Sequence, residues 1–219
     1  MTVLAVCGLK REAKIVARAA GVSLAIGGGA IWEGCEGVIS IGIAGALAED
    51  LCAGEAVIAE RVVTANEAYE TDEKWTARLA ARLPDARIGA ILGRGAIADS
   101  IEVKAALRGS TRADAVDMES HLAARAAIAA GLPFAALRFI SDTAGCALPP
   151  AALAAMNPDG SIALGRVLAS VARRPGQIPA LVRTGRESEK AFLALLRGVE
   201  ALGPGLGCPY LGQLPLDMA

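Results

Sequence analysis

Three carboxylates in this sequence stand where a site for acid–base chemistry can be built. Glu12 follows the first apolar run of the chain, Glu119 opens a helical pattern, and Asp142 ends the last apolar run. Ligands of open α/β sheets bind beyond the carboxyl ends of the strands, so residues that directly follow strands are the first candidates for a site. The only histidine, His121, excludes mechanisms that need two imidazoles, including most zinc-hydrolase sites, and no metal site is expected. The sequence therefore favours chemistry by carboxylates, backbone amides and arginine.

The elements that would position these residues alternate between strands and helices. Short apolar runs that end in glycine are typical of buried strands in a largely parallel sheet. The predicted strands are 2–7, 22–26, 38–43, 55–64, 87–92 and 133–140, and the predicted helices are 10–20, 72–83, 100–108 and 117–130. Beyond Pro150 only helices are expected, at 161–174 and 187–202, on either side of a segment broken by Pro175 and Pro179. We expect one α/β domain over residues 1–219, with three layers, a mixed and largely parallel central sheet, and a helical C-terminal segment at 160–203.

Composition excludes several classes of protein. With 219 residues, 54% of them hydrophobic, the chain can bury one full-sized core, which excludes a disordered protein. With a net charge of -1, the chain lacks the excess of basic residues that is typical of nucleic-acid-binding domains, and that class is excluded. No uncharged run is long enough for a membrane-spanning helix, and no signal peptide can be drawn at the N-terminus. Five scattered cysteines without a C-x-x-C pair fit a reduced, cytoplasmic protein.

Four segments between Val3 and about Ala144 resemble the nucleoside phosphorylase and methylthioadenosine nucleosidase superfamily. The strongest likeness is residues 115–119, Ala-Val-Asp-Met-Glu, followed by residues 138–142, Arg-Phe-Ile-Ser-Asp. Residues 42–47, then 54–57, are similar to that family's glycine loop and the strand after it. Within the superfamily, residues 117–121, 148–150 and 175–179 most resemble the hopanoid-associated phosphorylases, which are understood to release adenine from adenosylhopane, a lipid nucleoside.

The resemblance implies cleavage of the N-glycosidic bond of a purine nucleoside, with adenosylhopane giving adenine and ribosylhopane or phosphoribosylhopane. Such a bond breaks through an oxocarbenium-like sugar, and the leaving purine has to be protonated. By resemblance, Asp142 is the acid at purine N7, with a pKa raised by burial or by neighbouring carboxylates. Glu12 matches the carboxylate that positions or deprotonates the attacking water. These two residues form the expected catalytic pair.

The remaining site residues are also assigned by resemblance. Glu119 would accept hydrogen bonds from the ribose hydroxyls, and Met118 would pack beside the sugar. The other expected substrate-binding residues are Ser141, Arg138, Ile97 and Ala98. Phosphate or water would meet the loop of Gly42, Ile43, Ala44 and Gly45 together with Arg11. No cofactor is implied, inorganic phosphate being an optional co-substrate, and a homo-oligomer is expected.

Two departures from the family pattern keep the choice between phosphorolysis and hydrolysis open. Ile43 stands where many relatives place a hydroxyl residue, which removes a donor to phosphate or water. The connection from Gly27 to Val38 is shorter than in relatives and lacks a helix. The alternatives are a hydrolytic nucleosidase for methylthioadenosine or adenosylhomocysteine, and a nucleoside-binding protein without catalysis. A third class, an NAD-dependent enzyme, is suggested by G-x-G-x-x-A at residues 93–98, but the following helix is short and turn glycines are favoured.

Each assignment also has a structural alternative. Asp117 and Glu119 could complement the dipole of a helix, and Glu12 could lie on a solvated helix face. Arg138, inside an apolar strand, is expected to pair with an acid such as Glu119 or to bind ligand. His121 is expected to be structural and to pair with Asp117 across one helical turn.

The C-terminal segment is basic. Residues 160–203 hold seven Arg or Lys against three Glu, and Arg166, Arg173 and Arg174 share an amphipathic pattern with aliphatic residues. Such a helix can lie on an anionic membrane surface, so peripheral membrane contact is one prediction for this segment. The alternative is a helix that packs on the domain and keeps its arginines in solvent.

Overall fold

The structure, a computed structural model, describes residues 2–27, 34–154 and 163–211. Its strands are β1 (Thr2–Cys7), β2 (Val22–Ile26), β3 (Cys35–Ala46), β4 (Ala56–Val63), β5 (Ala68–Glu70), β6 (Arg87–Gly93), β7 (Ala115–Asp117) and β8 (Phe134–Asp142). Its helices are α1 (Lys10–Val16), α2 (Glu73–Arg82), α3 (Ile101–Thr111), α4 (Ser120–Ala129), α5 (Pro150–Leu153), α6 (Leu164–Arg173) and α7 (Ile178–Leu202). Two short 3₁₀ turns, η1 (Pro175–Gln177) and η2 (Pro204–Gly207), flank α7.

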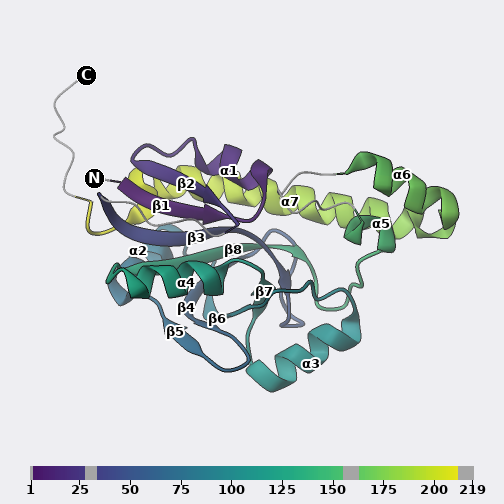
Figure 1. Cartoon of the computed structure of the whole chain (residues 1–219), viewed down its shortest axis with the longest axis horizontal. Helices are drawn as coiled ribbons and strands as arrows, with labels where there is room; N and C mark the ends of the chain where they lie inside the picture. Colours follow the sequence, from purple (N-terminus) through teal and green to yellow (C-terminus); the bar gives the residue numbers. More distant parts are fainter. Residues whose placement is uncertain (1, 28–33, 155–162, 212–219) are drawn as a thin grey trace.

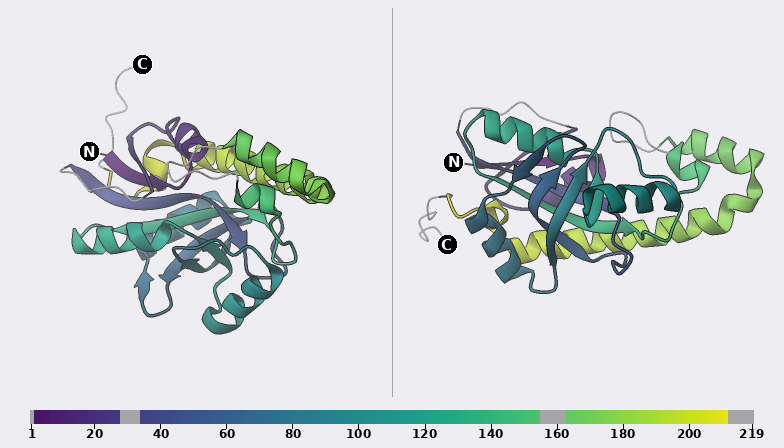
Figure 2. Two further views of the ribbon diagram at one scale, coloured as in Figure 1. Left: turned by 45° about the vertical axis from the view of Figure 1, so that its right-hand side comes forward. Right: turned by 90° about the horizontal axis from the view of Figure 1, so that it is seen from below.

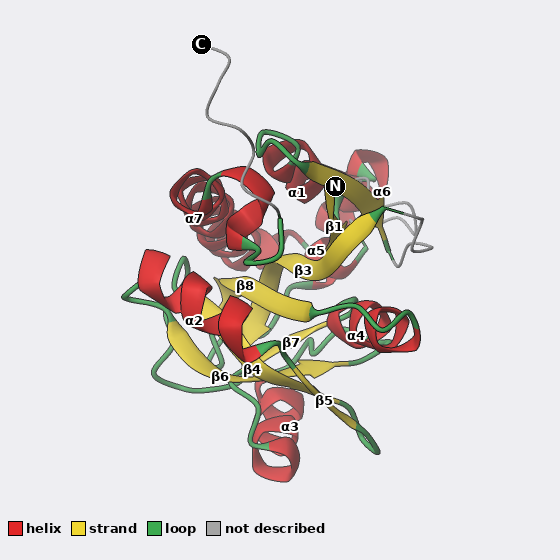
Figure 3. Cartoon of the chain, turned by 90° about the vertical axis from the view of Figure 1, so that its left-hand side faces the viewer, coloured by secondary structure: helices red, strands yellow, loops and turns green. Residues whose placement is uncertain are grey.

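The strands form one mixed sheet in the order β2-β1-β3-β7-β6-β4-β5, with β8 between β3 and β4. Parallel pairs join β1 to β2 and β3, β3 to β8, and β6 to β4 and β7, whereas β3–β7, β4–β5 and β4–β8 are antiparallel. Because β8 pairs with both β3 and β4, five strands close into a ring, which is seen end-on in Figure 3. The mixed, largely parallel sheet is confirmed, and its closure is a feature that the sequence patterns did not predict.

Helices cover both faces of the sheet, which confirms the layered α/β architecture (Figures 1 and 3). Side chains of a strand alternate between its two faces, so Val3 and Ala5 join the core cluster that includes α1, α2 and α7, and Leu4 joins the cluster with α4. Trp75 of α2 is fully buried, and its indole N–H donates to the carbonyl of Leu206 over 3.0 Å. The smaller third cluster packs against α3.

Several predicted boundaries were wrong, for local reasons. The helix expected at 117–130 begins at Ser120, because Asp117 ends β7, which pairs with β6. The strand expected at 38–43 continues to Ala46, since β7 and β8 both supply hydrogen-bonding partners that far. Pro179 lies in the first turn of α7, where a proline is tolerated, so that helix is longer than predicted. Part of the short 27–38 connection and the start of the 161–174 helix lie outside the described residues.

Candidate active site

Two of the predicted carboxylates pack directly on glycines at the carboxyl ends of β1 and in β3. A Cβ atom added to Gly8 would lie 2.6 Å from Cδ of Glu119, and one added to Gly42 would collide with the carboxylate of Glu12. The acids occupy space that any side chain at these two positions would fill. Gly8 follows β1, and β1 pairs with β3, so the two carboxylates share one edge of the sheet. The predicted convergence of Glu12 and Glu119 is therefore present in the structure.

Glu12 is held by three backbone amides. Its Oε2 accepts from the N–H groups of Gly8 (2.8 Å) and Leu9 (2.7 Å), and its Oε1 accepts from the N–H of Ile43 (2.7 Å). Glu12 is 2% exposed, so it is not a residue of a solvated helix face. Burial raises the pKa of Glu12, opposed by the charge of Arg138 and by the three amides. A fixed carboxylate with a raised pKa is suited to accept a proton from a water molecule.

Glu119 comes directly before α4 and is partly buried. Its pKa is raised to about 7, mainly by burial. The charge of Arg138 opposes the shift, whereas the neighbouring charges of Asp117 and Glu12 add to it. Glu119 thus titrates close to neutral pH, and its affinity for hydroxyl donors depends on pH in that range.

Asp142 ends β8, and the residue opposite it in β3 is Gly45. A Cβ atom at Gly45 would lie 3.1 Å from Asp142 Oδ2. Ser141 Oγ donates to Asp142 Oδ1 over 2.7 Å and lies 3.1 Å from the carbonyl oxygen of Ala44. Asp142 is buried. The strand-end pair of Ser141 and Asp142 therefore lies against β3, the strand whose Gly42 carries Glu12.

A buried lysine, Lys104 of α3, is the neighbour of Asp142 that sequence reasoning missed. Its ammonium donates to Asp142 Oδ2 (2.5 Å) and to the carbonyls of Thr143 (2.8 Å) and Cys146 (2.9 Å), and the side chain is 0% exposed. A cation from a distant helix, rather than a neighbouring carboxylate, is therefore the charged group next to Asp142. The available signal in the sequence was a lysine placed between the apolar residues Val103 and Ala105.

Arg138 lies beneath the site and is 1% exposed. Its Nε donates to Asp117 Oδ2, and its Nη2 donates to Ser40 Oγ (2.6 Å) and Ser120 Oγ (3.2 Å). The structure pairs it with Asp117 rather than with Glu119, and its position in the middle of β8 holds it inside the protein. Arg138 therefore supports the carboxylates electrostatically and does not face outward to a ligand.

The predicted glycine loop is part of a strand. Gly42 to Gly45 belong to β3, and the Ile43 amide is engaged by Glu12. Arg11, expected to attract phosphate, forms an ion pair with Glu189 of α7 (2.7 Å) and lies 4.1 Å above the ring of Phe192. The Ile43 amide and the Arg11 guanidinium, both expected to contact an anion, therefore already have partners within the protein.

The remaining predicted residues lie around this edge with different exposures. Met118 is exposed and Ile97, in the connection from β6 to α3, is partly buried. Ala98 is buried in the third core cluster, so it supports that connection from inside. We therefore keep Met118 and Ile97 as the two accessible apolar candidates.

Two nitrogen atoms near the end of β6 lack hydrogen-bond partners among the described residues: Arg94 Nη1 and His121 Nδ1, both of them buried. A Cβ atom at Gly93 would lie 2.7 Å from His121 Nδ1, so the imidazole packs against the strand end. Burial lowers the pKa of His121. The helical pair of His121 with Asp117 that the sequence suggested does not form, because Asp117 precedes α4.

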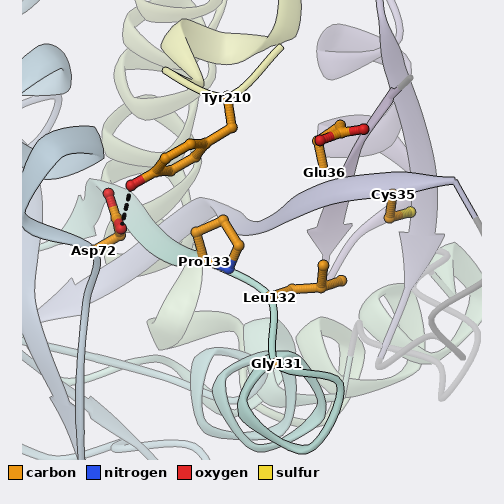
Figure 4. Close-up of a pocket in the computed structure, with 7 residues that line it drawn as sticks. All are labelled: Cys35, Glu36, Asp72, Gly131, Leu132, Pro133 and Tyr210. Atoms are coloured by element: carbon orange, nitrogen blue, oxygen red, sulfur yellow. Dashed lines mark hydrogen bonds between the residues drawn. The ribbon is translucent and has the colours of Figure 1, made fainter. Parts of the chain in front are cut away.

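A pocket of about 520 Å³ lies at the opposite end of the strands (Figure 4). It is lined by residues that include Cys35 at the start of β3 and Pro133 before β8, and Tyr210 donates there to Asp72 over 2.8 Å. This pocket is far along the strands from Asp142, which ends β8. In the part of the chain that the structure describes, no group of three or more His, Cys, Asp or Glu side chains is placed to hold a metal ion.

The family of this chain follows from comparison with known proteins. The chain belongs to the phosphorylase superfamily, whose family model matches residues 3–173. A search of curated proteins found no match.

Solved structures share the fold. Futalosine hydrolase of Helicobacter pylori strain 26695 is 16% identical over 92% of this chain and 97% of its own, with a TM-score of 0.67. The methylthioadenosine/adenosylhomocysteine nucleosidase of Colwellia psychrerythraea 34H, solved with adenine, is 16% identical over 92% and 96%, with a TM-score of 0.65. The Streptococcus pneumoniae nucleosidase, solved with 8-aminoadenine, is 17% identical over 89% and 100%, with a TM-score of 0.60.

Proposed function

We propose that this protein hydrolyses the N-glycosidic bond of a purine nucleoside. The observation that carries the proposal is the group of buried acids at one sheet edge, in which Glu12 and Glu119 have raised pKa values. Membership of the phosphorylase superfamily and the shared fold with nucleosidases support it. Inorganic phosphate is not required in this proposal, and neither is a cofactor.

Each acid has a separate task in the proposed reaction. Glu119 accepts hydrogen bonds from the ribose hydroxyls, while Asp142 gives a proton to purine N7 as the bond from the base to C1′ breaks. Glu12 takes a proton from the water whose oxygen bonds to C1′ of the oxocarbenium-like sugar. The products are the free purine and the ribose derivative. Lys104 keeps the Asp142 side chain in place by a hydrogen bond, and the proton that Asp142 gives to the purine is replaced from water in each turnover.

Water rather than phosphate is the nucleophile that the contacts favour. A phosphate would need free backbone amides and cations, but the Ile43 amide is bound to Glu12 and Arg11 is bound to Glu189. Glu12 itself would repel a phosphate dianion at this point. The one contrary observation is Arg94, whose buried Nη1 lacks a partner among the described residues and could serve a phosphate.

The substrate we propose is an adenine nucleoside with a large apolar group at the ribose 5′ position, adenosylhopane first. This follows from the resemblance of residues 117–121, 148–150 and 175–179 to the hopanoid-associated phosphorylases. Methylthioadenosine and adenosylhomocysteine are the second candidates, because the neighbouring nucleosidases of known structure are named for them. Futalosine joins the panel on the fold shared with futalosine hydrolase.

The test is release of the free base. Purified protein is incubated with adenosylhopane, adenosine, methylthioadenosine, adenosylhomocysteine or futalosine, with and without phosphate, and the free base and the sugar product are identified by chromatography and mass. We expect adenine and an unphosphorylated ribose product at equal rates in both buffers. A phosphorylated sugar that appears only with phosphate would replace hydrolysis by phosphorolysis. Nucleoside binding in calorimetry without any base release would show a binding protein instead.

A further inference from the structure

A helical hairpin extends from the domain at the end towards which β1 and β8 run. We call residues 163–186, which comprise α6, η1 and the start of α7, the hairpin. Figures 1 and 2 show it reaching beyond the sheet. None of the described α6 side chains is buried, and all six buried residues of α7 lie between Ala191 and Leu202. The hairpin therefore contributes little to the core of the domain.

The apolar side chains of α6 are only partly covered by the domain, with Val167 and Val171 half-buried. Leu168 is 62% exposed, and helical geometry places Val171 on the same face. Arg166 and Arg173 occupy the opposite face, and they line a hollow of about 540 Å³ with Pro150 of α5. Leu168 thus leaves part of the apolar face of α6 uncovered, while Arg166 and Arg173 are exposed as well.

The first turns of α7 continue this exposure. Ile178 and Val182 are 44% and 45% exposed and lie one helical turn apart on one face. The six buried residues of α7 centre on Leu195, which lies about 100–140° away around the helix axis at 100° per residue, whereas the nearest of them, Phe192, lies about 40–80° away. The stripe of Ile178 and Val182 is therefore not a continuation of the face that packs on the sheet.

The charge of the hairpin has one sign. Residues 163–186 contain five arginines and no Asp or Glu, within a chain whose net charge is -1. Arg173, Arg174, Arg183 and Arg186 are exposed. Exposed aliphatic side chains beside unbalanced arginines are the two features that bind a helix to an anionic lipid surface.

We propose that the hairpin lies on the surface of a membrane that contains anionic lipid. Leu168, Ile178 and Val182 enter the headgroup region, and the exposed Arg183 and Arg186 of α7 contact lipid phosphates. The chemistry required of the partner is a broad negative surface over an apolar layer. Contact at the surface is the form that the hairpin allows, because no described helix is long and apolar enough to cross a membrane.

The base of the hairpin is tied to the candidate active site. Gln177 accepts a hydrogen bond from the Ala151 N–H over 2.9 Å, and α5 follows the strand that ends at Asp142. At the other end, Glu189 of α7 binds Arg11, next to Glu12. A bound membrane would thus lie on the side where the strand ends open. Use of this position to take up a lipid-linked nucleoside rests on the proposed function, whereas membrane binding does not.

Vesicle co-sedimentation tests the proposal with the full chain. Vesicles of phosphatidylcholine alone are compared with vesicles that also contain phosphatidylglycerol, and bound protein is measured as a function of lipid and salt. We expect binding to the anionic vesicles only, and weaker binding at high salt. Replacing Arg183 and Arg186 by Gln should weaken binding by about 30-fold, from the attraction that each basic residue contributes near the surface. Leu168→Asn should weaken it by at least about fivefold.

The matched control is Ile128→Asn, at an isoleucine of α4 that is 53% exposed and lies outside the hairpin, and it should bind vesicles like the unmodified protein. Absence of vesicle binding, or equal binding to both vesicle types, would overturn the proposal. Equal loss in the control and hairpin variants would do so too. Self-association that Leu168→Asn abolishes, without any vesicle binding, would identify the face as a contact between copies. Base release from soluble nucleosides is measured in parallel, so loss of membrane binding and loss of catalysis are distinguished.

Discussion

The pH dependence of stability should report the buried acid Glu119 directly. The pKa of Glu119 is about 7 in the folded protein against 4.5 for an ordinary glutamate. Between these values the folded protein holds a proton that the unfolded chain has released, so the free energy of unfolding falls as pH rises from about 4.5 to 7. The difference in pKa corresponds to about 3 kcal/mol. Above pH 7 the penalty is complete and the contribution becomes constant.

Glu119→Gln removes this titration while it preserves the shape of the side chain. Urea unfolding of both proteins from pH 4.5 to 7.5 gives the difference between their free energies of unfolding. We expect the variant to gain up to about 3 kcal/mol relative to the unmodified protein over this range. The raised pKa of Glu12 affects both proteins and largely cancels in the difference. A difference that is constant over the range, or that changes in favour of the unmodified protein, would refute the burial argument.

Three further predictions follow from individual contacts. Gly42→Ala should displace the Glu12 carboxylate and lower base release on the order of 100-fold, whereas Gly95→Ala, where nothing lies within 4 Å, should not. Arg138→Met should lower the free energy of unfolding by about 3–5 kcal/mol in urea titrations, because it leaves Asp117 charged and unpaired; Arg125→Met, at an exposed pair with Glu67, should change it little. The KM for the nucleoside should rise as pH falls below about 7, because protonated Glu119 no longer accepts both ribose hydroxyls; a KM that is flat from pH 6 to 8 would argue against that contact.

The positions of the acids could be predicted from the sequence because they depend on local patterns. Asp142 directly follows an apolar run, and Glu12 follows the first strand, so a parallel sheet brings both to one edge. The sequence pattern predicts a loop at the glycines opposite these acids, Gly42 and Gly45. In the structure these glycines leave room for the carboxylates of Glu12 and Asp142. That role depends on which strands and side chains lie next to each other in the fold, and a short stretch of sequence does not reveal it.

The pairings that sequence reasoning missed join residues far apart in the chain. Lys104 reaches Asp142 from a helix 38 positions earlier, and Arg138 reaches Asp117 over 21 positions. Both are charged residues in apolar surroundings, which shows that each needs a buried partner but not which one. Closure of the sheet by β8 brings these pairs together, and strand periodicity carries no information about such closure.

The most direct test of the central claim is base release by Asp142→Asn. The amide oxygen of Asn can still accept the hydrogen bond of Lys104, but the buried ammonium loses its counter-ion, so we expect a less stable variant and compare rates at a temperature where both proteins are folded; the proton can no longer be given to the purine. We expect unmodified protein to release adenine and the variant to release it at least about 100-fold more slowly, with thermal unfolding showing a folded protein. Near-normal release by the variant, or none by the unmodified protein from any nucleoside of the panel, would contradict the account.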